Sequence, residues 1–114
     1  MKIYTKEEIF ACLVTCDKLI RENSYKAKKW KNYGDCCYES YEDVYLEQAD
    51  KWREYQTVIR SLLTAQYTLK EIIQYTKQYE KRCTLRTTNP TTQKAVKEMV
   101  TQIQKNECKV VKTE

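Results

Sequence analysis

The sequence contains no histidine, a single glycine (Gly34) and a single proline (Pro90) among its 114 residues. Without histidine the chain lacks the usual general base near neutral pH, and its cysteines lack the usual partner for a thiolate mechanism. The scarcity of glycine argues against a Gly-rich phosphate loop, and the scarcity of both turn residues disfavours β-sandwiches and barrels. We therefore expect a helical protein that is not an enzyme and that uses no cofactor.

Long apolar runs are also missing. No stretch reaches the roughly 18 apolar residues of a membrane-spanning helix, and charged residues follow Met1 too closely for a signal peptide. We expect a cytoplasmic protein without membrane contact, whose six cysteines are thiols and not disulfides. The spacing of Cys12 and Cys16 and the Cys36-Cys37 pair could offer thiolates to a metal, but zinc sites usually combine two close pairs of Cys or His. We expect no metal site.

The strongest periodic pattern covers residues 35–66. Aromatic and aliphatic residues recur there at alternating spacings of three and four, which predicts a long amphipathic helix. Its apolar face is wide, as in helices that pack into bundles. The two lines of this face are Tyr38, Tyr45, Trp52, Ile59 and Gln66, and Tyr41, Gln48, Tyr55 and Leu62.

Local signals mark the helix ends. A Thr followed three residues later by Glu forms a capping box, which predicts helix starts at Thr5 and Thr68. Gly34 predicts the end of the first helix, and Asn89-Pro90 predicts the start of the last. No glycine or proline interrupts the region around Gln66, so one continuous long helix is an alternative to the break that we expect there.

The short connection at Gly34 predicts that the first two helices form an antiparallel hairpin. We expect residues 1–114 to be one all-α domain, a three- or four-helix bundle built on this long hairpin. The predicted helices cover about 5–31, 35–65, 68–83 and 90–105, and the polar tail over 106–114 is expected to fray.

The net charge of +5 is unevenly distributed along the chain. Residues 1–34 hold eight basic and four acidic side chains, whereas residues 35–64 hold three basic and seven acidic ones. Within the first segment, Lys28, Lys29, Trp30 and Lys31 combine charge with an aromatic ring, as sites for nucleic acid do. The alternative is that these lysines complement the dipole of their helix end and are neutralised by the acidic start of the next helix.

A second basic cluster has only Glu80 as a nearby acid and leads into a Thr-rich linker. Its members are Lys77, Lys81, Arg82 and Arg86. Hydroxyl groups and a helix start beside such a cluster suit an anion, although a solvated face has the same composition. We expect any phosphate-bearing ligand to prefer this cluster to the one on the first helix.

Ten tyrosines are about three times the ordinary number for a chain of this length. Tyr and Trp dominate protein interfaces, so Tyr38, Tyr41, Tyr45 and Tyr55 are candidate contacts for a protein partner. The same residues would serve as core, or as the interface of a homo-oligomer.

These observations predict a small non-enzymatic helical binding protein that acts on a protein or nucleoprotein partner. The alternative is a nucleic-acid or nucleotide-binding protein that uses its basic clusters. In size, in its lack of catalytic groups and in its Lys-, Glu- and Tyr-rich helices, the chain resembles small accessory proteins of phages and mobile elements, including inhibitors of host defence. This resemblance is one of general type, and it implies an accessory or inhibitory role.

Overall fold

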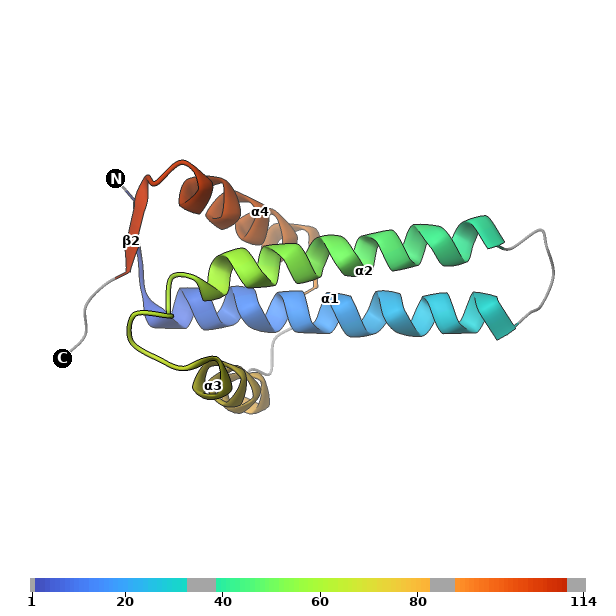
Figure 1. The fold of residues 1–114 in the computed structure, drawn as a ribbon, viewed down its shortest axis with the longest axis horizontal. Helices are drawn as coiled ribbons and strands as arrows, with labels where there is room; N and C mark the ends of the chain where they lie inside the picture. Colours follow the sequence, from blue (N-terminus) through green and yellow to red (C-terminus); the bar gives the residue numbers. More distant parts are fainter. Residues whose placement is uncertain (1, 33–38, 83–87, 111–114) are drawn as a thin grey trace.

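The computed structural model describes residues 2–32, 39–82 and 88–110. Within them the chain forms β1 (Lys2–Tyr4), α1 (Lys6–Asn32), α2 (Glu39–Arg60), α3 (Leu69–Arg82), α4 (Pro90–Gln104) and β2 (Cys108–Val110). Helices α1 and α2 are antiparallel along the long axis, and α3 and α4 pack beside one half of this hairpin (Figure 1). The predicted all-α bundle built on a long antiparallel hairpin is confirmed.

The helix starts follow the sequence signals. The Thr5 hydroxyl accepts from the Glu8 N–H at 3.1 Å, and the Glu8 carboxylate accepts from the Thr5 N–H at 3.3 Å. Thr68 and Glu71 make the same reciprocal pair at 3.2 and 3.0 Å. Asn89 caps α4 by accepting a backbone N–H three residues later. Each cap satisfies backbone donors that have no partner inside the helix, which is typically worth about 1 kcal/mol.

Helices α2 and α3 are separate, and α2 ends earlier than expected. Its α-helical part ends at Arg60, where the sequence predicted residue 65. From there the N–H groups of residues 61–63 donate to carbonyls three residues back, so the backbone tightens into successive turns. The turns bury Leu63 and redirect the chain so that α3 packs against α1.

The core lies where the four helices overlap. On α2 and the turns after it, the core follows two adjacent lines of residues. Trp52, only 3 % exposed, and fully buried Ile59 lie on one, and buried Ala49, Gln56 and Leu63 lie on the other. Of the second predicted line, Tyr41 and Gln48 are exposed, whereas Tyr55 and Leu62 pack against the core from its edge. The buried face of α2 is therefore displaced from this line toward the line of Ala49.

The two strands pair in parallel and join the ends of the described chain (Figure 1). Helix α4 stops because Asn106 adopts a left-handed conformation with φ of 56°, and the Glu107 N–H then donates to the Gln102 carbonyl at 2.9 Å. Residues 108–110 of the tail that was expected to fray form β2, and residues 111–114 lie outside the described part. Cys108 and Val110 pack against the core, which explains why this polar segment is ordered.

Candidate functional site

The hairpin extends beyond the other two helices. Residues 22–32 of α1 and 39–50 of α2 continue past α3 and α4 as a two-helix projection, which we call the arm (Figure 1). Ala27 and Ala49 are buried there, and their small side chains allow the two helices to approach closely. The arm is thus held mainly by its own two helices, and much of its surface is free of cover from the bundle.

Aromatic side chains connect the two helices of the arm. The Trp30 and Tyr41 rings stack with centroids 5.2 Å apart. Lys26 Nζ lies 5.7 Å from the centroid of the Tyr45 ring, which is a cation–π geometry. Two of the four tyrosines predicted as protein contacts therefore lie on the arm and take part in its internal packing.

The other two predicted contact tyrosines are Tyr38 and Tyr55. Tyr38 lies outside the described residues. Tyr55 packs edge-to-face on Trp52, with centroids 5.3 Å apart, and lies nearer to α4. The structure therefore does not bring the four tyrosines together on one surface.

Exposed apolar side chains are concentrated on the arm. Seven large hydrophobic residues are exposed in the described part of the chain, and four of them lie between residues 25 and 46. Their exposed fractions are 69 % for Tyr25, 50 % for Tyr41, 50 % for Val44 and 43 % for Leu46. Val44 and Leu46 are two residues apart and so point to different sides of α2, and the four side chains are distributed around the arm.

The basic cluster predicted on the first helix also lies on the arm. Lys28, Lys29 and Lys31 are exposed, and Trp30 is half-buried. Lys26 pairs at 3.4 Å with Glu22 of its own helix. Among the described side chains, no ion pair joins these lysines to an acid of α2. Direct ion pairs across the hairpin therefore do not neutralise the lysines in this part of the chain.

A cleft of about 680 Å³ lies at the base of the arm, between α1, α2 and α3. Five cationic and two anionic side chains line it, together with two isoleucines and a glutamine. The lining residues are Asp17, Ile20, Arg21, Arg53, Gln56, Arg60, Ile73, Lys77, Glu80 and Lys81. We refer to this recess as the cleft.

The predicted cluster on the third helix is divided by the structure. Lys77 and Lys81 lie one turn apart on the same face of α3 and both line the cleft. Arg82 lines a different pocket, of about 300 Å³, together with Lys6 and Tyr67. Arg86 lies outside the described residues. Of the three predicted side chains that the structure describes, the cleft therefore receives two.

The sequence did not identify the arginines of the cleft. Arg21 comes from α1, and Arg53 and Arg60 come from α2, so all three are far from Lys77 in the chain. Only the packing of α3 across the hairpin brings them together. The i, i+4 spacing of the two lysines was the one local signal for this site.

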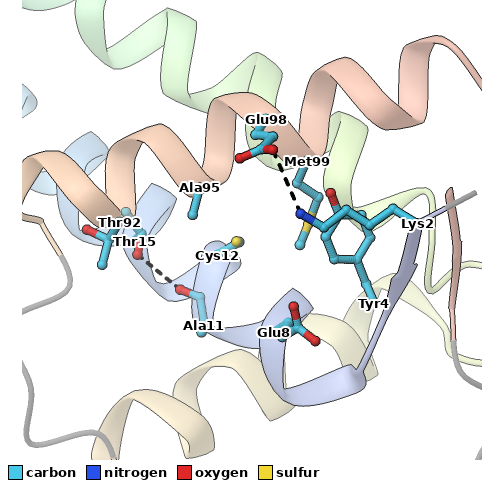
Figure 2. Close-up of a pocket in the computed structure, with 10 residues that line it drawn as sticks. All are labelled: Lys2, Tyr4, Glu8, Ala11, Cys12, Thr15, Thr92, Ala95, Glu98 and Met99. Atoms are coloured by element: carbon cyan, nitrogen blue, oxygen red, sulfur yellow. Dashed lines mark hydrogen bonds and ion pairs between the residues drawn. The ribbon is translucent and has the colours of Figure 1, made fainter. Parts of the chain in front are cut away.

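A smaller cavity, of about 240 Å³, lies between β1, α1 and α4 (Figure 2). Tyr4, Cys12 and Met99 line it, and the ion pair between Lys2 and Glu98 at 3.8 Å lies at its side. Burial, with a smaller effect of nearby Glu8, raises the pKa of the Cys12 thiol to about 11. At neutral pH this thiol is protonated and is not an active nucleophile.

Other chemical classes of site find little support among the described residues. There, no group of three His, Cys, Asp or Glu side chains is arranged to hold a metal ion. Among the described helices, none combines the length and the apolar character that a membrane-spanning segment needs. Comparison with models of known families, with characterised proteins and with solved structures finds no match to this chain.

Proposed function

We propose that the protein is a non-enzymatic binding protein that contacts a protein partner through the arm. The observation that supports this most directly is that Tyr25, Tyr41, Val44 and Leu46 are all exposed on a projection that the rest of the bundle leaves largely uncovered. Burying apolar area of this kind is the main driving force of protein association.

The charge of the arm indicates the chemistry of the partner. Its α1 side carries the exposed Lys28, Lys29 and Lys31, whereas its α2 side carries the exposed Asp43 and Glu47. A complementary surface would combine an apolar centre with acidic groups on one side and basic groups on the other. Complementary charge of this kind mainly sets orientation and association rate.

The proposal is tested by recovery of a partner from lysate of the native host. We would compare the wild type with the double variant Tyr25→Ser/Val44→Ser, and with the control Ile3→Ser/Leu69→Ser. The control residues are similarly exposed, at 59 % and 57 %, but lie away from the arm. Circular dichroism checks that each variant is folded.

The expected result is one partner, identified by mass spectrometry, that the wild type and the control retain and the arm variant loses by at least about tenfold. A loss of 1.4 kcal/mol or more has this effect, and it is typical of a contact residue at an interface. Equal recovery by the arm variant contradicts the proposal, as does recovery that disappears after nuclease treatment.

The alternative function is binding of nucleic acid or a nucleotide, and the observation that favours it is the excess of cations in the cleft. A nucleoprotein partner would use both surfaces. An accessory or inhibitory role of the phage or mobile-element type is compatible with either and stays a prediction, as do the cytoplasmic location and self-association.

A further inference from the structure

The cleft holds more positive charge than its own ion pairs neutralise. Arg21 pairs with Glu80, and Arg53 pairs at 2.8 Å with Asp50. Asp17, the other acid of the cleft, accepts a hydrogen bond from the Gln56 amide. Lys77, Lys81 and Arg60 make no ion pair with another described side chain, although Arg60 lies close enough to Asp17 to lower the pKa of that carboxyl.

Arg60 lines the cleft from α2 with a half-buried side chain. Its Nε atom is buried and, within the described part of the chain, has no hydrogen-bond partner. An Nε atom without accessible surface is out of reach of a ligand, so any contact with one has to come from other nitrogens of the guanidinium. The guanidinium presents its donors as a planar fork, which matches the oxygens of a carboxylate or phosphate.

The form of the site indicates the size of the ligand. The five cations come from three helices and line one recess, whereas a nucleic-acid backbone is usually followed by a basic stripe along a surface. Among the described residues, no aromatic ring on which a base could stack lines the cleft, and its apolar walls are Ile20 and Ile73. A compact ligand with several negative charges fits better than a polymer.

We infer that the cleft binds the phosphate chain of a small di- or triphosphate ligand, through Lys77, Lys81 and Arg60. Two lysines one turn apart on α3 place their ammonium groups on one side of such a chain. Arg60 approaches from α2 and supplies a bidentate contact. This site is separate from the contact surface of the arm and does not depend on a protein partner.

The test is isothermal titration calorimetry of the full chain with inorganic tripolyphosphate at low salt, repeated at about 200 mM salt. Lys77→Gln/Lys81→Gln is compared with Lys28→Gln/Lys29→Gln, which removes the same charge from the arm. All four lysines are exposed, so both variants should fold. Arg60→Lys keeps the charge but removes the fork.

We expect the wild type to bind tripolyphosphate, the cleft variant to bind at least about tenfold more weakly, and the arm variant to change by less than about threefold. Arg60→Lys should weaken binding as well. ATP in place of tripolyphosphate should show the same ranking, because the phosphate chain is the recognised group.

Two results would overturn the inference. One is the absence of binding by folded wild-type protein at low salt, and the other is equal or greater weakening by the arm variant. A single-stranded oligonucleotide serves as the competing probe. If it binds more tightly than tripolyphosphate and is lost in the arm variant, the basic groups serve nucleic acid and not a small ligand.

Discussion

The side-chain amide of Gln56 donates a hydrogen bond to the Asp17 carboxylate, which connects α2 to α1 inside the cleft. Burial is the largest influence on the pKa of Asp17 and raises it, while Gln56 and nearby Arg60 act in the opposite direction. The cost of desolvating the charged carboxylate therefore exceeds the gain from these favourable interactions, so ionised Asp17 destabilises the folded protein.

Asp17→Asn should therefore make the protein more stable at pH 7. The folded state holds the Asp17 proton more tightly than the unfolded state, whose pKa is near 3.8. The stability of the wild type consequently falls as pH rises from that value through the raised pKa of the folded state. Asparagine keeps an oxygen that can accept from Gln56.

The measurement is the difference in unfolding free energy between Asp17→Asn and the wild type, from urea denaturation at several pH values. This difference should be smallest in acid, grow above about pH 4 and then level off. A variant that is less stable than the wild type at pH 7 would show that the contacts with Arg60 and Gln56 outweigh burial.

Trp52→Ala should destabilise the protein by about 3–5 kcal/mol, as for other buried aromatic residues cut back to alanine. Trp52 is 3 % exposed and packs edge-to-face on Tyr55. Urea denaturation measures the loss, with exposed Tyr25→Ala as the control, for which we expect less than about 1 kcal/mol. A small loss at Trp52 would place it outside the cooperative core.

Thiol labelling should distinguish the cysteines by burial. Cys12, Cys16 and Cys108 are free thiols, and burial raises the pKa of each. Because the thiolate is the reactive form, Cys12 and Cys16 should resist iodoacetamide at pH 7.5 until the protein is unfolded. Half-buried Cys108 should react sooner. Peptide mapping by mass spectrometry would detect early labelling of Cys16, which is incompatible with this packing.

The strand pair should contribute measurably to stability. Val110 packs against the core from β2, whereas neighbouring Lys109 is exposed. Val110→Ser should cost about 1–2 kcal/mol, and Lys109→Ser should stay within about 0.5 kcal/mol, as for most surface changes. Equal effects in urea denaturation would mean that the segment frays in solution, as its composition suggested.

Sequence reasoning succeeded where the determinant is local. The capping residues Thr5, Thr68 and Asn89 bond to groups three residues away, so their roles could be read directly. Periodicity also identified Trp52 and Ile59 as core. It could not reveal that Tyr41 is exposed, because a repeat defines which face is apolar but not how far neighbouring helices cover it.

The site was predictable only in part for a related reason. Lys77 and Lys81 are four residues apart, so they share one face of any helix that contains them. Arg21 and Arg60 join them only through the packing of α3 across the hairpin, which depends on the turns after α2. Strand β2 was missed because its partner β1 lies at the other end of the chain.

That pairing also sets an order for folding. Lys2 and Cys108 are more than a hundred residues apart, whereas α1 and α2 are adjacent in the chain. Closing a long loop costs more conformational entropy than closing a short one, so contacts between the chain ends are gained late unless helices first bring them together. The hairpin should therefore form early, and the parallel strand pair should close the molecule last and open first in native-state hydrogen exchange.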